Sequence, residues 1–520
     1  MKRKCILISG IVGLTVNLTS CNKEKKSSQE TPNIVIIYAD DVGYGDLECY
    51  NGTVPTPNVN RIAQNGVQFT NAHAVAATST PSRFGLLTGV YPWRQKGTGI
   101  AAGNAGMIIR PERFTLADAA KSVGYKTAAI GKWHLGIGET ASQDWNGFIT
   151  PNLTDIGFDY SYIMAATGDR VPCVFIENAT VDNWDPEAPI SVSYTTPFEG
   201  EPTGKQNPEL LKLHPSHGHD QAIVNGISRI GYMKGGGKAL WVDENIADQI
   251  TDKAVKFISQ NKNKPFLLYF GTHDIHVPRT PHERFIGKTS MGPRGDAILQ
   301  FDYQVGAVLD ALEENGLTQN TIVILSSDNG PVVDDGYIDR AVELLGNHKP
   351  AGEFRGGKYS SFEAGTRVPM IVSWPKKIKK NIVSNALFSH IDIMASLSCL
   401  MKADISHKSN IDSKNSIETL MGTDQIGRQY IMQQSLHSVI SVVSDKWKFI
   451  PASKGPKKNW DTNTELGNEQ QDQLYNLYED IYESKNIVNE NPEKVEFLRN
   501  ILRHEFAKGV DTKFPHIEQY

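Results

Sequence analysis

The sequence is poor in cysteine. Five cysteines occur among 520 residues, and two of them, Cys5 and Cys21, belong to the N-terminal segment. The other three, Cys49, Cys173 and Cys399, are widely separated and show no metal-ligand spacing. This pattern argues against a disulfide framework and against a cysteine zinc site. We expect the three side chains to act as small buried apolar groups.

The sequence also lacks an excess of charge of one sign. Lys and Arg number 53 and Asp and Glu number 58, which gives a formal net charge of -5. No basic run interleaved with aromatic residues occurs, so no nucleic acid is expected as a partner. Beyond the N-terminal segment, no stretch is long and apolar enough to predict a transmembrane helix. The length allows one large domain and a smaller one.

The first residues predict export. A basic start is followed by an apolar stretch that ends at Leu18, and then by Thr-Ser-Cys21. This ending resembles a bacterial lipobox, so residues 1–21 are predicted to be a lipoprotein signal peptide whose Cys21 is acylated. The alternative is cleavage nearby, with Cys21 incidental. Residues 22–31 are predicted to be a polar tether. We therefore expect a lipoprotein in the periplasm or at the outer membrane, which meets the membrane through its lipid anchor alone.

Apolar runs alternate with amphipathic helical patterns, which predicts an α/β domain. Several runs are almost unbroken, as strands covered on both faces require. The expected strands are Asn33–Tyr38, Thr127–Ile130, Phe266–Phe270, Thr321–Leu325 and Met370–Trp374, with helices at Asp248–Ser259 and Ala297–Asn315.

The composition also predicts a division into domains. Residues 32–405 are expected to form the main domain, with a long irregular insertion at Ala165–Gly237, and residues 406–427 a polar linker. Residues 428–520 are expected to form a C-terminal subdomain. Its expected elements are two strands within Gln429–Ile450, namely Val439–Val443 and Trp447–Ile450, and a helix at Pro492–Lys508.

Polar residues follow four of the expected strands. Ligands of open α/β sheets bind beyond the carboxyl ends of the strands. One polar residue at such a place is usually a helix cap or turn residue, but four such endings together predict a site. The endings are Asp40-Asp41, Gly131-Lys132-Trp133-His134, Thr272–His276 and Ser327–Gly330.

The segment Ser79-Thr-Pro-Ser-Arg83, followed by Leu87-Thr-Gly89, resembles the signature of the type I sulfatases. The resemblance extends from Pro32 to about Asn489. It includes Thr56-Pro-Asn58, Gly131–His134, His276-Val-Pro278, Ser327–Gly330, Gly357-Lys358, Glu363-Ala-Gly365 (where the family more often has Glu-Gly-Gly), Leu474–Leu477 and Asn486-Ile487. By itself, Ser79 could also be a helix cap, with Pro81 in the first turn.

The resemblance implies an alkaline-phosphatase-like sulfatase fold: a large central mixed β-sheet flanked by helices, and a smaller C-terminal α+β subdomain with an antiparallel sheet. The sequence is similar to those of the carbohydrate sulfatases of gut bacteria such as Bacteroides. The resemblance implies that a serine-type maturation enzyme oxidises Ser79 to formylglycine. The implied metal ligands are Asp40, Asp41, Asp328, Asn329 and the modified residue 79. All-oxygen ligands with three carboxylates suit a hard cation, and Ca²⁺ tolerates irregular geometry better than Mg²⁺. The resemblance implies Ca²⁺, because the family usually carries calcium.

The implied mechanism is nucleophilic catalysis with metal assistance. The hydrated aldehyde of residue 79 attacks sulfur near Arg83, and Lys132 and Lys358 balance the charge of the sulfate oxygens. His276 protonates the leaving oxygen, and His134 takes a proton so that the aldehyde reforms and sulfate leaves. Taken one by one, the lysines could be solvated and the histidines structural.

The expected substrate is a sulfated glycan, cut by exo action at a galactose or N-acetylhexosamine sulfate. The predicted substrate-binding residues are Asp169, Arg170 and Arg355, and further candidates are His214, His217, His219 and the loop Asp334–Arg355. Two alternatives remain open at this stage. One is a two-zinc phosphatase or phosphodiesterase, which the lack of an Asp-x-x-x-His element and the Asp-Asn pair at 328 disfavour. The other is a glycan-binding lipoprotein without activity, which would not be expected to retain Arg83, Lys132 and His276.

Overall fold

The computed structural model describes residues 31–406 and 412–509. The predicted signal peptide at residues 1–21, and all of the predicted tether except its last residue, lie outside this part of the chain. Residues from Pro32 onward form one compact unit. The boundary predicted at 406–427 stays a prediction. Within the described residues, no helix combines the length and apolarity needed to cross a membrane.

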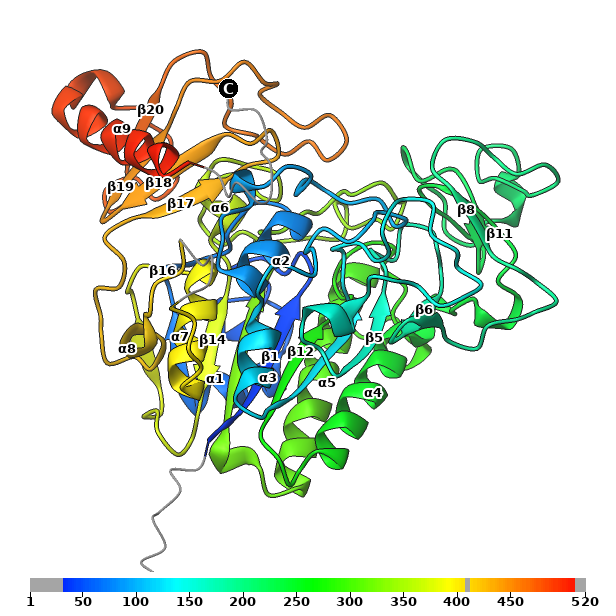
Figure 1. Ribbon diagram of the computed structural model, residues 1–520. Helices are drawn as coiled ribbons and strands as arrows, with labels where there is room; N and C mark the ends of the chain where they lie inside the picture. The colour runs from blue at the N-terminus through cyan, green and yellow to red at the C-terminus, as the bar shows by residue number, and fades with distance from the viewer. Residues whose placement is uncertain (1–30, 407–411, 510–520) are drawn as a thin grey trace, which may run out of the picture. The chain divides into compact units, whose positions relative to one another are not determined.

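A large mixed sheet forms the centre of the fold (Figure 1). Its ten strands lie in the order β15-β2-β14-β13-β1-β12-β4-β5-β6-β7. The four central strands run parallel, in the order β13 (Thr321–Ser327), β1 (Asn33–Ala39), β12 (Phe266–Gly271) and β4 (Lys126–Lys132). The other six are β15 (Ile382–Ser384), β2 (Gly66–Phe69), β14 (Met370–Ser373), β5 (Tyr160–Met164), β6 (Phe175–Glu177) and β7 (Thr180–Val181).

All five expected strands are present in this sheet. In β1 every residue is buried, as expected for a strand that is covered on both faces. Two registers fix the centre of the sheet, because Ile34 pairs with Leu267 of β12 on one side and with Ile322 of β13 on the other. The strand β14 runs antiparallel to β13, so the sheet is mixed.

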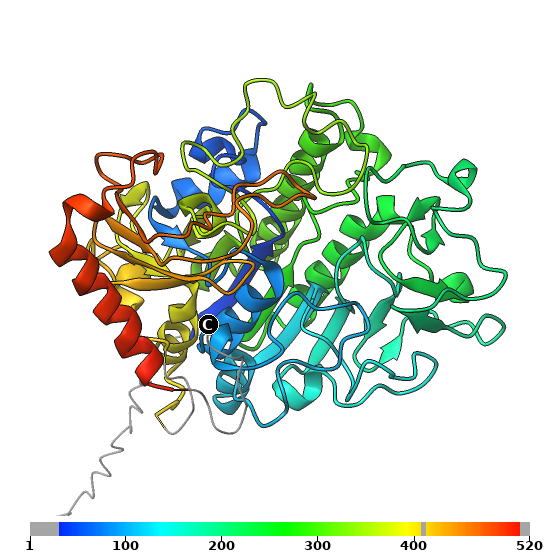
Figure 2. The same ribbon diagram turned by 90° about the horizontal axis from the view of Figure 1, so that it is seen from above.

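Helices cover both faces of the sheet (Figure 2). The helix α4 buries an apolar stripe against β4 and β5, in which Ile250, Ala254 and Phe257 are buried. One group packs together as α1 (Pro57–Gln64), α4 (Ile246–Gln260) and α5 (Gly292–Glu314), and another as α2 (Ser79–Thr88), α3 (Leu116–Ser122) and α7 (Ile393–Met401). The helices α4 and α5 confirm the two expected helices and begin two and five residues earlier than expected.

The C-terminal part forms a second, antiparallel sheet (Figure 1). Its strands are β17 (Ile431–Gln434), β18 (Ile440–Ser444), β19 (Trp447–Ile450) and β20 (Gln473–Asn476). The helix α9 (Pro492–Ala507) packs on β18 and β19. The two strands expected within 429–450 are present as β18 and β19, but a third strand there, β17, was not predicted. Its Met-Gln-Gln sequence shows no apolar alternation, although all four of its residues are buried.

The insertion at 165–237 is less irregular than expected. Its first part adds β6 and β7 to the edge of the central sheet. The remainder holds two small antiparallel pairs, β8 (Ser191–Ser193) with β11 (Tyr232–Lys234) and β9 (Ile223–Val224) with β10 (Ile227–Ser228). The other short elements are β3 (Ala72–His73), β16 (Phe388–Ser389), α6 (Glu363–Thr366) and α8 (Ile417–Leu420).

Candidate active site

The polar residues that follow the central parallel strands meet at one edge of the sheet. Asp40 and Asp41 follow β1, and Asp328 follows β13. Lys132 is the last residue of β4, and His276 lies beyond β12. All five side chains are almost fully buried. The convergence that the strand endings predicted is therefore present.

Ser79 lies at the centre of this group. It is the first residue of α2, and Thr78 is the N-cap residue, so the alternative of Ser79 as a cap is wrong. Its hydroxyl oxygen accepts a hydrogen bond from Lys132 Nζ at 2.8 Å. The same oxygen lies 3.4 Å from Asp40 Oδ1 and 3.3 Å from Asn329 Oδ1. The positive end of the α2 dipole also favours negative charge at this position.

Arg83 fixes the far side of the group. Its guanidinium donates twice to Asp328 Oδ2, from Nε at 3.0 Å and from Nη2 at 2.7 Å. Burial opposes ionisation of the Asp328 carboxyl, but the nearby Arg83 and Lys132 outweigh it and lower its pKa to about 2. Lys132 Nζ also lies 2.6 Å from Asp40 Oδ1. Burial raises the pKa of Asp40 to about 8, against the opposing charge of Lys132.

Lys358 closes the group from another loop. Its Nζ lies 2.8 Å from Asp41 Oδ2 and 3.2 Å from Asp335 Oδ2. Burial disfavours its charge, but Asp335 and Asp41 outweigh burial and raise the pKa of Lys358 well above its usual value. Asn329 Nδ2 donates to Asp41 Oδ1 at 2.7 Å, which turns the Asn329 Oδ1 atom toward Ser79.

The two histidines present free ring nitrogens at the site. His134 Nε2 lies 3.0 Å from the carbonyl oxygen of Ala101, and its Nδ1 has no hydrogen-bond partner among the described residues. His276 Nδ1 lies 2.7 Å from the carbonyl oxygen of Val277, and its Nε2 is 3.8 Å from Asp41 Oδ2. Because a carbonyl only accepts, each ring donates to it and leaves the other nitrogen unprotonated. Burial lowers the pKa of both rings well below the usual value, with Lys132 adding to the effect at His134 and Lys358 at His276.

The oxygen atoms at this edge fit a hard cation. Asp40, Asp41 and His276 each place a possible ligand atom within 4.8 Å of the others. Asp40 Oδ2 is buried and has no hydrogen-bond partner in the described chain. A buried carboxylate oxygen without a partner is costly, and a bound cation would remove that cost. Asp328 and Asn329 supply further oxygen atoms beside it.

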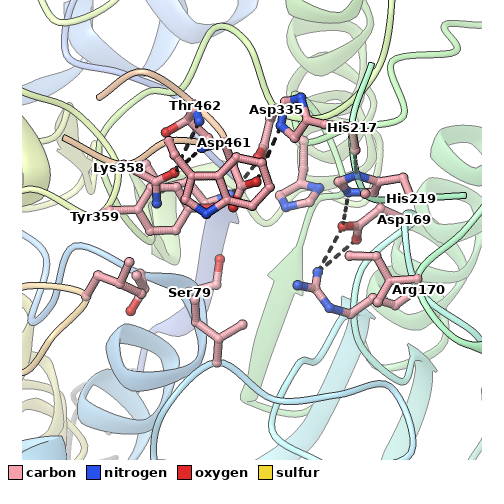
Figure 3. Close-up of a pocket in the computed structure, with 18 of the residues that line it drawn as sticks. Ser79, Asp169, Arg170, His217, His219, Asp335, Lys358, Tyr359, Asp461 and Thr462 are labelled. Carbon is pink, nitrogen blue, oxygen red and sulfur yellow. Dashed lines mark hydrogen bonds and ion pairs between the residues drawn. The ribbon is translucent and has the colours of Figure 1, made fainter. Parts of the chain in front are cut away.

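A cavity of about 540 Å³ opens above Ser79, within the size range of small-molecule sites. Figure 3 shows its polar walls, with Lys358 and Tyr359 on one side of Ser79 and Asp169 and Arg170 on the other. Asp169 accepts from Arg170 Nη1 at 2.9 Å and lies 3.1 Å from His219 Nε2. Thus the predicted residues Asp169 and Arg170 lie in the same cavity as four of the predicted catalytic residues, Ser79, His134, His276 and Lys358.

Arg355 lies elsewhere. It does not line the cavity, and its Nε donates to Glu465 Oε2 at 2.8 Å, while Nη1 donates to the carbonyl oxygen of Glu483 at 2.7 Å. Of the three candidate histidines in the insertion, His217 and His219 line the cavity and His214 does not. The cavity is also lined by Asn459–Thr462 of the C-terminal part, which were not predicted from the sequence. A tryptophan within a run of Lys, Asn and Asp was the available signal.

Comparisons with known proteins agree with this arrangement. The sulfatase family model matches residues 32–403. An N-acetylgalactosamine-6-O-sulfatase of Bacteroides thetaiotaomicron is 51% identical over 507 residues, which cover 96% of this chain and 99% of the relative. Human arylsulfatase A is 29% identical over 436 residues, covering 80% of this chain and 74% of the relative.

A solved structure leads to the same family. It comes from work on the metabolism of multiple glycosaminoglycans by Bacteroides thetaiotaomicron, and it matches with a TM-score of 0.90 at 52% identity, covering 91% of this chain and 99% of that chain. The chain belongs to the sulfatase family. It is therefore an enzyme of the sulfuric ester hydrolase class, and the resemblance and the fold inferred from the sequence are confirmed.

Proposed function

We propose that this enzyme is a carbohydrate sulfatase that removes the 6-O-sulfate from a terminal N-acetylgalactosamine of a sulfated glycan. The observation that carries the proposal is the position of Ser79, whose hydroxyl faces Lys132, Asp40 and Asn329 at the base of a polar cavity. The name of the 51% identical relative, which this chain covers almost completely, supports the choice of sugar and sulfate position.

Two groups would complete the site: a formylglycine made from Ser79 and a Ca²⁺ ion held by Asp40, Asp41, Asp328, Asn329 and residue 79. When present, the aldehyde hydrate would supply the nucleophile and the ion would supply Lewis-acid polarisation. The carboxylates Asp40, Asp41 and Asp328 are balanced by Arg83, Lys132 and Lys358. Asp335 also lies beside Lys358, so four carboxylates face three cationic side chains when a bound cation keeps Asp40 ionised. A divalent cation would then leave a net charge of +1, which suits an anionic sulfate ester.

The histidines divide the proton transfers between them. His134 Nδ1 carries a lone pair that can take a proton from the hydroxyl group at residue 79. His276 Nε2 lies beside Asp41 and would donate a proton to the leaving sugar oxygen. An anionic substrate near this ring favours its protonated form and so opposes the effect of burial on its pKa. Arg83 and Lys132 hold Asp328 and the Ser79 oxygen in place.

The cellular setting belongs to the proposal as well. A serine-type maturation enzyme would remove two hydrogens from Ser79. The N-terminal sequence supports an exported lipoprotein that is anchored by acylated Cys21 in the periplasm or at the outer membrane.

The first experiment joins a mass measurement to an activity assay on the same preparation. The tryptic peptide with residue 79 should weigh two hydrogens less than its serine form, and a hydrazine reagent should trap the aldehyde. The same protein should release sulfate from 6-O-sulfated, but not 4-O-sulfated, N-acetylgalactosamine. Unmodified serine in an active preparation would refute the formylglycine, and equal rates on both sugars would refute the proposed position.

Metal removal tests whether the enzyme binds a cation at this site. A ligand present at a hundred times its Kd stabilises the folded state by about 2.7 kcal/mol. Chelation should therefore lower both activity and the melting temperature, and Ca²⁺ should restore both. The melting temperature of Asp40→Asn should not respond to Ca²⁺. A response equal to that of the wild type would show that the ion binds elsewhere.

A further inference from the structure

Trp460 is an exposed aromatic side chain beside a polar cavity. It is 82% exposed, the largest exposed fraction among the large apolar side chains of the described residues. It lies in the loop between β19 and β20, and it lines the same cavity as Ser79. Isolated exposed apolar residues are ordinary, but a bare indole ring at the mouth of a sugar-sized cavity is suited to ligand contact.

Hydrogen bonds order the backbone of the loop around Trp460. Asn459 Oδ1 accepts from the backbone N–H groups of Asp461 at 2.9 Å and Thr462 at 3.1 Å, which form a tight turn around Trp460. The backbone N–H of Asn459 donates to the carbonyl oxygen of Thr464 at 2.8 Å. An ordered surface loses less entropy when a ligand binds to it.

Arg355 ties this loop to the main domain. Its guanidinium binds Glu465, five residues after Trp460, and packs 4.0 Å from the centre of the Phe362 ring. The residue predicted from sequence to touch substrate is thus placed to position the loop instead. Its effect on the substrate would pass through Trp460.

Across the mouth, the loop meets the insertion. The ring centres of His217 and Trp460 are 5.8 Å apart, and His217 Nε2 lies 3.9 Å from Asp461 Oδ1. In the close-up, Asp461 and Thr462 lie across the cavity from Ser79 (Figure 3). The buried Asp169 and the buried Ser79 lie deeper, and the exposed indole stands at the mouth.

We propose that Trp460 is the platform for the second sugar of the glycan, stacking on the pyranose joined to the sulfated terminal residue. This inference rests on the proposed function, because it needs a sulfated sugar bound at Ser79. A pyranose ring presents a face of C–H groups, and the flat, electron-rich face of an indole is complementary to it. A polar rim of His217 and Asp461 remains available to the hydroxyl groups of that sugar.

The test compares two substrates of different length. Trp460→Ala should lower kcat/KM about fivefold to tenfold on a disaccharide with 6-O-sulfated N-acetylgalactosamine at its non-reducing end. The loss should appear in KM, and the value on the 6-O-sulfated monosaccharide should change much less. Trp460→Phe should recover part of the loss. The matched control is Phe497→Ala, which removes a 52% exposed aromatic ring on α9 that does not line the cavity.

Calorimetric binding of the same two sugars to the unmatured serine form gives a second readout that does not need turnover. Weaker binding of the disaccharide alone to Trp460→Ala supports the platform. Equal losses on both sugars, or none on the disaccharide, with an active wild type would overturn the platform and leave the proposed function standing. A wild-type protein that neither binds nor desulfates either sugar would overturn the proposed function and this inference together.

Discussion

Asp169 carries a negative charge in the wall of the cavity although its side chain is buried. Burial opposes ionisation, but Arg170 and His219 outweigh it and hold the pKa of the Asp169 carboxyl well below its usual value. A charge kept inside a site at this cost suits the binding of sugar hydroxyl groups, because an ionised acceptor discriminates strongly between donors.

Asp169→Asn is therefore expected to weaken substrate binding. The change removes one charged acceptor, and hydrogen bonds to charged groups contribute about 1.5–3 kcal/mol, so kcat/KM should fall about tenfold to a hundredfold, mostly through KM. Steady-state kinetics on the sulfated monosaccharide measure it. Asp182→Asn is the control, because Asp182 accepts from Tyr162 and does not line the cavity. An unchanged KM in Asp169→Asn would show that Asp169 does not bind the substrate.

The buried histidine His390 leads to a prediction about how stability depends on pH. Ser326 Oγ donates to the carbonyl oxygen of Pro369 at 2.6 Å and so accepts from His390 Nε2, 2.9 Å away. Tyr38 then donates to His390 Nδ1 at 3.0 Å, so neither ring nitrogen of His390 is free to take a second proton. Burial lowers the pKa of His390 to about 3, and that of the buried His73 to about 3 as well.

These two rings should make the fold sensitive to acid. Their stabilising contribution is complete above the unfolded-state pKa near 6.5 and is lost as the pH falls toward 3, because the unfolded chain binds protons that the folded chain refuses. The loss is about 1.4 kcal/mol per pH unit for each ring. Melting temperatures measured from pH 7.5 to 5 should fall, with a smaller slope in His390→Gln. The exposed His504 provides the control variant His504→Gln, and a slope unchanged in His390→Gln would contradict this account.

At the scale of the element, the end of β4 depends on a glycine. Gly131 has φ +96° and precedes Lys132. A Cβ atom built there would lie 1.9 Å from the carbonyl oxygen of Gly271 on the neighbouring strand β12. The close approach of these two strands sets the position from which Lys132 reaches Ser79.

Gly131→Ala should displace Lys132 and reduce activity more than tenfold, with a lower melting temperature. Gly124→Ala separates the two causes, because Gly124 has a similar φ of +88° and nothing within 4 Å of a built Cβ. Gly124→Ala should lose only the stability that the backbone strain costs, about 1–2 kcal/mol, and should keep its activity. Similar losses of activity in both variants would show that strand spacing does not matter here.

The strands differ in whether the sequence pattern alone predicts them. Buried strands such as β1 are continuous apolar runs, so all five expected strands, and the polar residues after four of them, could be predicted. The strand β17 could not, because Gln433 and Gln434 are polar yet buried, and a tertiary hydrogen bond from Gln433 Nε2 to Thr366 at 2.6 Å satisfies one of them. Short strands that depend on such long-range partners leave no local periodicity to detect.

At the scale of the whole molecule, the cavity is assembled from distant parts of the sequence. Asp169, His217, Asp335 and Trp460 come from the insertion, from the loop after β13 and from the loop of the second sheet. The family motif located the predicted catalytic residues because they lie in short contiguous segments at strand ends. It gave no information on Trp460 or on the position of Arg355, because neither residue is set by its local sequence.

The second sheet is bound to the main domain through a buried ion pair. Lys448 of β19 lies 3.0 Å from Glu363 of α6, and both side chains are fully buried. Burial opposes the ionisation of Glu363, but Lys448, His73 and Arg367 outweigh it and hold its pKa well below the usual value. Apolar packing joins the same two parts, since Tyr91 belongs to one core cluster with strand β18.

Lys448→Met should therefore destabilise the whole enzyme. It leaves a buried carboxylate with one fewer partner, and breaking a buried pair on one side costs about 3–5 kcal/mol. Lys457→Met is the matched control, because Lys457 and Glu469 lie 2.8 Å apart but are largely exposed, and such pairs contribute about 0–1 kcal/mol. Urea unfolding measures the free energy of unfolding of both variants.

The double variant Lys448→Met with Glu363→Gln should regain part of the stability, since the charge left without its partner, rather than the lost attraction, accounts for most of the penalty. If Lys448→Met instead loosened only the second sheet while the central sheet unfolded as in the wild type, the two sheets would be independent units, and the domain boundary expected at residues 406–427 would gain support.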